Sequence, residues 1–459
     1  MPSHRWTTAI ALTAALLFTL PAVAQQPFKP VLNTGDRLLH FDWPALSIGT
    51  GEYAEGPTGV TVFHFAKPAL AAVDVRGGAP GTVNTDYLRL GYNTPELDAV
   101  VFAGGSWYGL EATTAVATAL KDDGERSGGF DNIALAVGAI IYDLGGRRLN
   151  EIYPDKTLAQ AALRAARPGV FALGSEGAGR FAMSGGYFGC GAHSGQGGAF
   201  RQVGAVKIAA FVVVNALGVV TDREGRVVAC YPGPGWPAGL RTTDLLANTP
   251  QSRSGAWTGP PPGQTHGSRN TTISLVVTNQ KLGWDELQRL AVQVHSSMGR
   301  AIQPFATVDD GDVLYAVSTQ EVDAAAGQPV LAPIDLGAIA AETMWDAILS
   351  SVPEQPMASR PAAGPAPEPA SLAAFTGEFV FGPEVRIRVT QQGGRLFAQA
   401  VGRRDAYAIT RAAPVELLPA GDTAFTVPNR YPLALRFDPA GTLTINAGHW
   451  AQTGRRTGS

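Results

Sequence analysis

Hydrophobic and polar residues recur with two different periods along the chain, and each period predicts a different element. Short apolar runs such as LDAVVFA at 97–103 and AVKIAAFVVVN at 205–215 predict buried strands that end in glycine-containing turns. The segment at 110–124 predicts a helix after the first of these strands. The segments at 284–302 and 334–352 place apolar residues on one helical face, as expected for helices lying on a sheet. In the former, that face comprises Leu287, Leu290, Ala291, Val294, Met298 and Ile302.

The pattern changes at Pro353, and the change divides the chain. Residues 25–352 predict one mixed α/β unit, whereas residues 353–370 are too rich in proline and alanine to pack and predict a linker. Beyond the linker, residues 371–459 alternate apolar and polar positions around QQGG and DPAG turns. This last segment therefore predicts a small antiparallel β domain.

The first 24 residues have the features of a secretory signal peptide. Arg5 supplies a positive flank, an apolar run follows, and Ala22-Val23-Ala24 forms a cleavage site before Gln25. An uncleaved anchor is the weaker alternative because the apolar run is shorter than the roughly 20 residues that a bilayer requires. We expect an exported protein, periplasmic or secreted, with no membrane span once the signal is removed.

Composition narrows the partners and the chemistry. The 459 residues are 45% hydrophobic and 16% charged, with 55 glycines and 33 prolines, which indicates a large core and many tight turns. A formal net charge of −3 and the lack of basic runs make nucleic acid an unexpected partner. An oxidising compartment would permit one disulfide between Cys190 and Cys230, although the sequence does not show that they meet. Neither cysteine lies in a C-x-x-C motif, and His193 is the only histidine close to either of them in the sequence. These residues do not fit a zinc site, and we expect neither a metal nor a cofactor.

Common hydrolase motifs do not explain the sequence. The serine elbow G-x-S-x-G is missing, because GGSWYG has Tyr108 where the last glycine belongs. H-E-x-x-H and the phosphate-binding Walker loop are missing too, and the glycine-rich strings lack the spacing of a dinucleotide fingerprint. Any catalytic nucleophile must therefore come from another arrangement.

The junction RNTTISLVVTN at 269–279 offers such an arrangement. A polar loop turns there into a β-branched hydrophobic run. A threonine at a chain N-terminus carries its own base, an α-amino group with a reference pKa of about 7.7–8.0. To create that terminus, the Thr271 hydroxyl would attack the carbonyl of Asn270 in an N-to-O acyl shift, and the ester would then hydrolyse. On their own, these letters also fit a glycosylation acceptor or a turn that caps a strand.

Seven strings, in the order given below, resemble those of the L-aminopeptidase D-amidase/esterase family, which includes the β-aminopeptidases. The resemblance covers roughly residues 38–325. The strings are DVRGGAPGT (74–82), LDAVVFAGGSWYGLEA (97–112), IIYDLG (140–145), GSEGAG (174–179), VVVNALG (212–218), RNTTISLVVTN (269–279) and DGDVLYAVST (310–319). The resemblance implies a four-layer αββα sandwich and a precursor that splits into an α chain, 25–270, and a β chain from 271. It also implies small peptide, amide or ester substrates and a homo-oligomer of αβ units.

The resemblance also implies individual roles. Thr271 would be the nucleophile, and Asn215 would help to form the oxyanion hole. Tyr142 would lie near the oxyanion, and Asp310 and Asp312 would orient the amine of the nucleophile. Without the resemblance, Asn215 could simply end a strand, Tyr142 could be a core residue, and the acid pair could be a solvated turn.

Two further residues and one departure complete the site predictions. Gly105 and Ser106, in the turn after the first buried strand, are candidate substrate-binding or oxyanion residues. The string GYFGCGAHSGQGG after GAG departs from relatives, which often carry glycine and lysine there, and this leaves the substrate pocket open. We predict a self-cleaving aminopeptidase or amidase that acts on the N-terminal residue of short substrates. The alternatives are a non-catalytic exported binding protein on the same scaffold and an acyl transferase.

Overall fold

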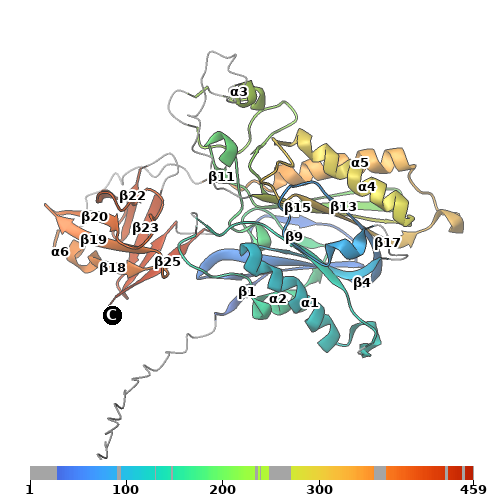
Figure 1. Cartoon of the computed structure of the whole chain (residues 1–459), viewed down its shortest axis with the longest axis horizontal. Helices are drawn as coiled ribbons and strands as arrows, with labels where there is room; N and C mark the ends of the chain where they lie inside the picture. Colours follow the sequence, from blue (N-terminus) through green and yellow to red (C-terminus); the bar gives the residue numbers. More distant parts are fainter. Residues whose placement is uncertain are drawn as a thin grey trace, which may run out of the picture.

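A computed structural model of the chain describes residues 28–89, 95–129, 131–145, 148–232, 236–237, 239–247, 270–355, 369–428, 433–446 and 450–457. These residues form a layered α/β part and a separate β barrel (Figure 1). The predicted signal peptide and most of the predicted linker lie outside the described residues. Among the described residues, no helix combines the length and apolar composition needed to cross a bilayer.

Two sheets lie face to face in the α/β part, and one long strand belongs to both. The first part of β4 (Gly56–Val75) pairs with two strands of the first sheet, and its last part pairs with β17 of the second. Its register on β6 shifts between His64 and Ala69, where the strand passes from one sheet to the other. The first sheet also contains β3 (Leu46–Tyr53), β5 (Thr82–Val83), β6 (Glu96–Ala103) and β7 (Ala136–Ile140). The second contains β12 (Gln196–Val203), β13 (Val206–Asn215), β15 (Thr271–Gln280) and β17 (Val313–Val322), in that order.

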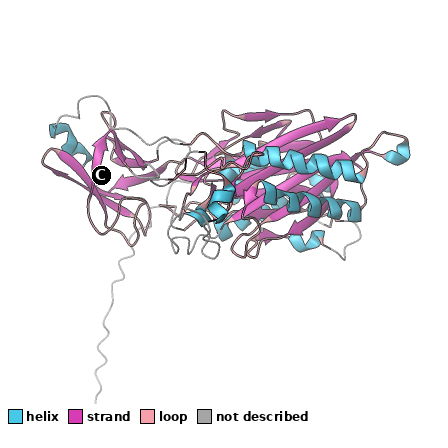
Figure 2. Cartoon of the chain, turned by 90° about the horizontal axis from the view of Figure 1, so that it is seen from above, coloured by secondary structure: helices cyan, strands magenta, loops and turns pink. Residues whose placement is uncertain are grey.

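Helices cover the outer face of each sheet (Figure 1), and Figure 2 shows helices lying across the strands on the face seen from above. The first sheet carries α1 (Glu111–Asp122) and α2 (Lys156–Arg164). The second carries α4 (Trp284–Ser297) and α5 (Pro333–Ser350). Three of these helices match those predicted at 110–124, 284–302 and 334–352. The four layers run helix, sheet, sheet, helix, so the predicted αββα sandwich is confirmed.

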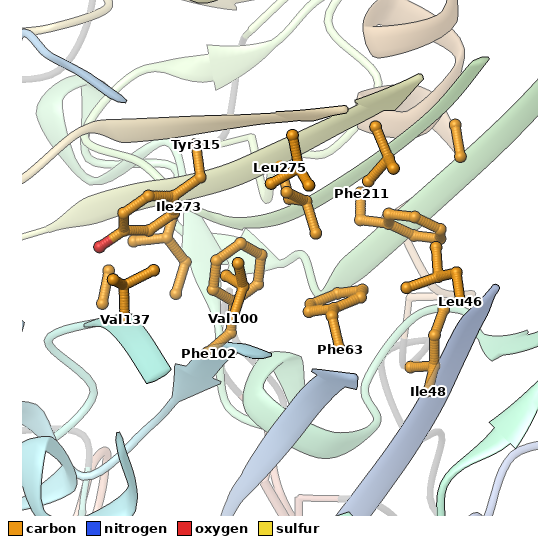
Figure 3. Close-up of a cluster of buried hydrophobic side chains, with 14 of the residues drawn as sticks. Leu46, Ile48, Phe63, Val100, Phe102, Val137, Phe211, Ile273, Leu275 and Tyr315 are labelled. Carbon is orange, nitrogen blue, oxygen red and sulfur yellow. The ribbon is translucent and has the colours of Figure 1, made fainter. Parts of the chain in front are cut away.

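Alternate residues of each strand separate the inner core from the outer ones, because successive strand side chains point to opposite faces. Phe63, Phe102, Phe211 and Leu275 meet between the sheets, with the Phe63 and Phe211 ring centroids 5.0 Å apart (Figure 3). Val276 lies on the opposite face of β15 and packs under the helices. Each of these aromatic side chains is almost fully buried, and removing one would cost about 3–5 kcal/mol.

The C-terminal part is a closed barrel of eight antiparallel strands within the described residues. Each strand pairs with the next, and the last pairs with the first through Phe379 and Arg456. The predicted QQGG turn joins β19 to β20, with Gly393 and Gly394 both at positive φ, as a two-residue type I′ hairpin turn requires. The strands are β18 (Gly377–Val380), β19 (Arg386–Gln392), β20 (Arg395–Ala400), β21 (Val415–Pro419), β22 (Ala424–Val427), β23 (Leu433–Asp438), β24 (Thr442–Ile445) and β25 (Gln452–Arg456). The predicted antiparallel β domain is confirmed, and its closure is an additional finding.

Candidate active site

Three neighbouring strands bring the predicted catalytic residues to one end of the second sheet. β15 begins at Thr271, and the antiparallel strand β13 ends at Asn215, its register partner. β17 runs parallel to β15 and begins directly after Asp312. Asn270 forms a parallel bridge with Asp310 just before the two strands start. Residues far apart in sequence therefore meet because the strand directions place these ends together.

Strand alternation sets where Thr271 and Asn215 point. Thr271 lies two and four residues before Ile273 and Leu275 on β15, so its side chain points to the same face of the sheet. Ile273 and Leu275 lie in the inter-sheet core. Asn215 lies two residues after Val213, which belongs to that core, so its side chain also points to this face. Both polar side chains therefore lie at the end of the inter-sheet layer, and both residues are buried. A nucleophile there is shielded from bulk water, which strengthens nearby electrostatic interactions.

The Asn270–Thr271 peptide is held by two donors. The Thr271 hydroxyl donates to the carbonyl oxygen of Asn270. The backbone N–H of Gly311 donates to the same oxygen over 3.0 Å. A carbonyl with such a donor is polarised, and a donor in this position would also stabilise negative charge on the oxygen. The hydroxyl thus lies against the group that it would attack in an acyl shift.

Gly311 is a residue that sequence reasoning did not single out. A Cβ there would lie 2.8 Å from the Thr271 Oγ1 atom and 2.7 Å from the carbonyl oxygen of Ala79. The first contact would displace the hydroxyl and the second would displace backbone. The only sequence clue was its place between the two predicted aspartates.

Asp310 and Asp312 are both buried, so the alternative of a solvated turn is wrong. Asp310 accepts from the Thr307 hydroxyl over 2.8 Å and from the Leu217 N–H over 3.3 Å. Asp312 accepts from the backbone N–H of Thr272 over 2.6 Å. Burial, with a contribution from the charge of Asp310, raises the pKa of Asp312 to about 8. Burial also raises the pKa of Asp310, so the pair can hold a proton near neutral pH.

The string DVRGGAPGT at 74–82 donates backbone hydrogen bonds to the two residues of this acid pair. The backbone N–H groups of Arg76 and Gly77 each donate to the carbonyl oxygen of Asp312 over 3.1 Å. The N–H of Ala79 donates to the carbonyl oxygen of Asp310 over 2.9 Å. A turn with no evident chemistry of its own therefore fixes the backbone that carries both carboxyl groups.

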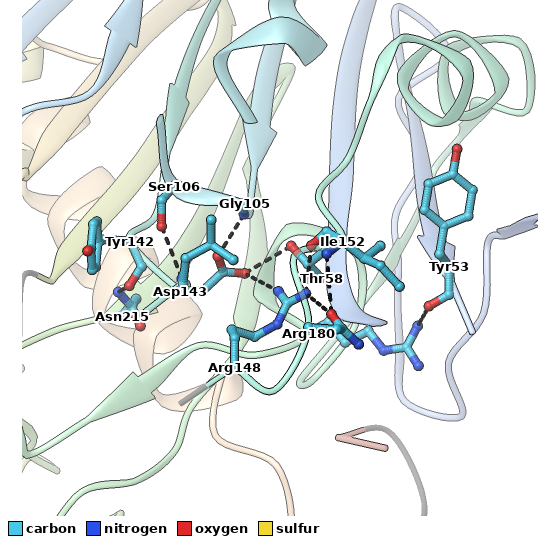
Figure 4. A network of polar contacts seen from close by, with 12 residues as sticks. Tyr53, Thr58, Gly105, Ser106, Tyr142, Asp143, Arg148, Ile152, Arg180 and Asn215 are labelled. Carbon is cyan, nitrogen blue, oxygen red and sulfur yellow. Dashed lines mark hydrogen bonds and ion pairs between the residues drawn. The ribbon is translucent and has the colours of Figure 1, made fainter. Parts of the chain in front are cut away.

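The side-chain amide of Asn215 is fixed at both ends. Its Oδ1 accepts from the N–H of Met183 over 3.1 Å. Its Nδ2 donates to the carbonyl oxygen of Tyr142 over 3.1 Å (Figure 4). Tyr142 therefore reaches the site through its backbone, and the predicted role of its side chain stays a prediction. The two hydrogen bonds set the orientation of the amide beside Thr271.

Gly105 and Ser106 make contacts within the protein. The N–H of Gly105 donates to a carboxylate oxygen of Asp143 over 2.7 Å. The Ser106 hydroxyl accepts from the N–H of Leu144 over 3.0 Å. Both residues thereby hold the segment that follows Tyr142 (Figure 4). Their predicted contact with substrate or oxyanion stays a prediction.

Asp143 and Arg148 are central to this network, and sequence reasoning missed both. Asp143 is fully buried and also accepts from the Thr58 hydroxyl over 2.9 Å. An Arg148 nitrogen lies 3.7 Å from its carboxylate, and the same guanidinium donates to the carbonyl oxygen of Ile152 over 2.6 Å. The string IIYDLG contains Asp143, but nothing in the sequence places Arg148 against it.

Comparison with known proteins decides the family. Residues 41–360 match the model of Peptidase family S58. The chain belongs to this family. A 6-aminohexanoate-oligomer endohydrolase of Paenarthrobacter ureafaciens is 43% identical over 330 residues, covering 70% of this chain and 88% of the relative. An uncharacterized aminopeptidase of Mycobacterium tuberculosis is 33% identical over 333 residues, covering 69% of this chain and 91% of the relative.

Two solved structures also show similarity to this chain. A β-aminopeptidase of a Burkholderia species has a TM-score of 0.47 and 19% identity, covering 67% of this chain and 84% of its own. An L-aminopeptidase D-Ala-esterase/amidase of Ochrobactrum anthropi has the same TM-score and identity, covering 67% of this chain and 83% of its own. The resemblance to this family is confirmed by the family match, and the protein is a hydrolase.

In this S58 hydrolase, the departing string at 186–198 lies beside the site. Cys190 and Cys230 form a disulfide, with their Cα atoms 5.0 Å apart. The N–H of Tyr187 donates to the carbonyl oxygen of Leu217, two residues after Asn215, over 3.0 Å. The buried ring of His193 stacks on Trp450 of the barrel, with centroids 3.6 Å apart.

Across the described ranges, no group of three or more His, Cys, Asp and Glu is arranged to hold a metal ion.

Proposed function

We propose that this chain cleaves itself between Asn270 and Thr271 and then hydrolyses amide bonds through an acyl-Thr271 intermediate. The observation that carries the proposal is the Thr271 hydroxyl on the Asn270 carbonyl oxygen, with Gly311 as a second donor. Membership of Peptidase family S58 supports it.

In the first reaction, Oγ1 of Thr271 bonds to the carbonyl carbon of Asn270, and the C–N bond breaks. The hydroxyl proton ends on the freed nitrogen, and the product is an ester. Water then hydrolyses the ester, which leaves a carboxylate on Asn270 and an α-amino group on Thr271. The acid pair, able to hold a proton near neutral pH, lies beside this peptide and can accept and return the proton.

In the second reaction, the α-amino group of Thr271 takes the hydroxyl proton while Oγ1 attacks the substrate carbonyl. Asn215 lies opposite Thr271 in register, and its amide is oriented by Met183 and Tyr142. That amide would donate to the oxyanion. The carboxylates of Asp310 and Asp312 would hold the amine of the nucleophile. The C–N bond of the substrate then breaks, and the leaving amine takes the proton from the α-amino group of Thr271. Water hydrolyses the ester on Thr271, which releases the acyl group as a carboxylic acid and restores the hydroxyl.

Two classes of substrate are considered for this site. The sequence predicts removal of an N-terminal residue from short peptides, amides or esters. The names of the relatives at 42–43% identity favour a second class, the internal amide bonds of 6-aminohexanoate oligomers. The aminopeptidases among the relatives are 33% identical. We therefore propose oligomers of ω-amino acids as the first substrate class to test and aminoacyl amides as the second.

Export and oligomerisation also belong to the proposal. The Cys190–Cys230 disulfide supports a mature protein in an oxidising compartment, such as the periplasm. An oligomer of αβ units is expected from the family resemblance and can be measured by light scattering on the purified protein.

The experiment compares the full chain with Thr271→Ala and Thr271→Ser. Intact mass and N-terminal sequencing should give a second fragment that starts at residue 271 in the wild type and in Thr271→Ser. Thr271→Ala should stay uncleaved and should release nothing from 6-aminohexanoate oligomers or from L-, D- and β-aminoacyl amides. Adding an acceptor amine distinguishes hydrolysis from acyl transfer. An uncleaved wild-type chain with full turnover would refute the proposal.

A further inference from the structure

The barrel contacts the loop that follows Tyr142. Leu149 of that loop is 1% exposed and packs into the hydrophobic core of the barrel. Its N–H donates to the Oε1 atom of Gln452 over 2.6 Å, and Gln452 is also buried. A side chain inserted into another domain's core, with a buried hydrogen bond beside it, makes this a fixed contact.

Arg404 of the barrel binds the same loop from a second side. Its two terminal nitrogens donate to the carbonyl oxygens of Gly145 and Arg148 over 2.8 and 2.7 Å. The side chain of Arg148 turns back toward the carboxylate of Asp143. The barrel thus fixes the backbone of a residue whose side chain braces the segment next to Tyr142.

A second contact lies on the other side of Asn215. Trp450 stacks on His193 with an interplanar angle of 15°. His193 pairs across a short two-stranded ladder with Met183, whose N–H donates to Asn215. Gln355, at the start of the connection to the barrel, donates to the His193 carbonyl oxygen and accepts from its N–H. His193 is therefore held by the barrel and by the segment that leads to it.

We infer that the barrel is a positioning domain for the Asn215 amide. Met183 and Tyr142 are backbone partners of the amide, and the barrel holds the segment that carries each one. The inference rests on the proposed function, in which that amide stabilises the oxyanion. Displacing a catalytic group by about 1 Å can cost roughly a hundredfold in rate. Loss of either barrel contact should therefore lower the rate without removing any group that touches substrate.

The test uses the full chain with Trp450→Ala and, separately, Arg404→Ala. Each variant should lower kcat at least about tenfold and change KM less than about twofold, because the contact acts on orientation and not on substrate affinity. Trp450→Phe keeps a ring on His193 and should restore most of the rate. Arg395→Ala is the matched control, since Arg395 is a well exposed barrel residue paired with Glu416. Thermal unfolding of each variant confirms that the barrel is folded.

A second readout separates this inference from the proposed function. Hydrogen exchange is measured in Thr271→Ala, with and without Trp450→Ala. The rate of amide hydrogen exchange at residues 183–193 should be higher in Thr271→Ala/Trp450→Ala than in Thr271→Ala alone. It should stay unchanged in Thr271→Ala/Arg395→Ala. If the wild type shows neither cleavage nor turnover, the proposed function has failed, and the exchange result still decides whether the barrel holds this segment. Unchanged exchange, or a kcat for Trp450→Ala and Arg404→Ala equal to that of Arg395→Ala, overturns the inference.

Discussion

Asn215 lies directly opposite Thr271 across the antiparallel pair of β13 and β15. The two residues end and begin neighbouring strands in the middle of a sheet, so the ladder fixes their separation. A hydroxyl and an amide brought together in this way need no loop to close before they can act on one carbonyl group.

Replacing Asn215 with alanine should lower kcat by roughly 10²–10³-fold, the usual cost of losing one oxyanion donor. KM should change little, because the amide acts on charge that develops in the transition state. Asn279→Ala is the matched control: Asn279 is also buried, and it binds Lys207 and Ala205 at the far end of the same strands. Steady-state kinetics check the prediction, and equal rates for the two variants would contradict it.

Gly311→Ala should slow self-cleavage at least about tenfold. The added methyl group would lie 2.8 Å from the Thr271 Oγ1 atom, so the hydroxyl would have to leave its place on the Asn270 carbonyl. The fraction cleaved is followed on a denaturing gel during expression. Gly299→Ala is the control, because a Cβ at Gly299 would meet no atom within 4 Å. Wild-type cleavage in Gly311→Ala would show that this close approach is unimportant.

The acid pair should make stability fall as pH rises. Burial raises the pKa of Asp312 from 3.8 to about 8, so the unfolded chain releases this proton at lower pH than the folded chain. The free energy of unfolding therefore decreases between about pH 4 and pH 8 and levels off above that range. Urea unfolding at a series of pH values measures this decrease.

Asp310→Asn should make that decrease smaller. The variant removes one buried acid with a raised pKa, and it removes the charge that helps to raise the pKa of Asp312. Burial also raises the pKa of Glu52 to about 8. Glu52 therefore adds the same pH dependence to the free energy of unfolding of the wild type and of the variant. Asp36→Asn, a change at an exposed carboxyl, is the control. A decrease in Asp310→Asn as steep as in the wild type would contradict the prediction.

Removing the disulfide should destabilise the folded chain. The bond between Cys190 and Cys230 closes a loop with a sequence separation of 40 residues, and such a bond contributes about 2–4 kcal/mol. Cys190→Ala/Cys230→Ala should therefore lower the free energy of unfolding by that amount in urea titrations. Addition of reductant should then have no further effect on the variant. An unchanged free energy of unfolding would mean that the bond does not constrain the unfolded chain.

The sequence predicts local elements well where the hydrophobic period is strong. The run at 205–215 is a strand at Val206–Asn215, and the junction at Thr271 is the first residue of β15. Both follow from apolar patterning, which depends on neighbours along the chain. The residues named for catalysis came from the resemblance, and the strand ends bring Thr271, Asn215 and the acid pair together.

Contacts between distant segments could not be predicted in this way. Nothing along the chain indicates that β4 continues through both sheets, or that Arg148 turns back toward Asp143. The pairing of Cys190 with Cys230 also depends on the fold, since sequence gives their number but not their separation in space. The predicted signal peptide lies outside the described residues, so export stays a prediction.

The strand order of the second sheet determines what a break before Thr271 would leave. β15 and β17 would belong to the later fragment, and they lie between β13 and β4, which would belong to the earlier one. The two polypeptides would be interleaved within one hydrogen-bonded sheet. Separating them would mean tearing two ladders and exposing the core between the layers, so the halves would stay together as a single body without any covalent link at that point.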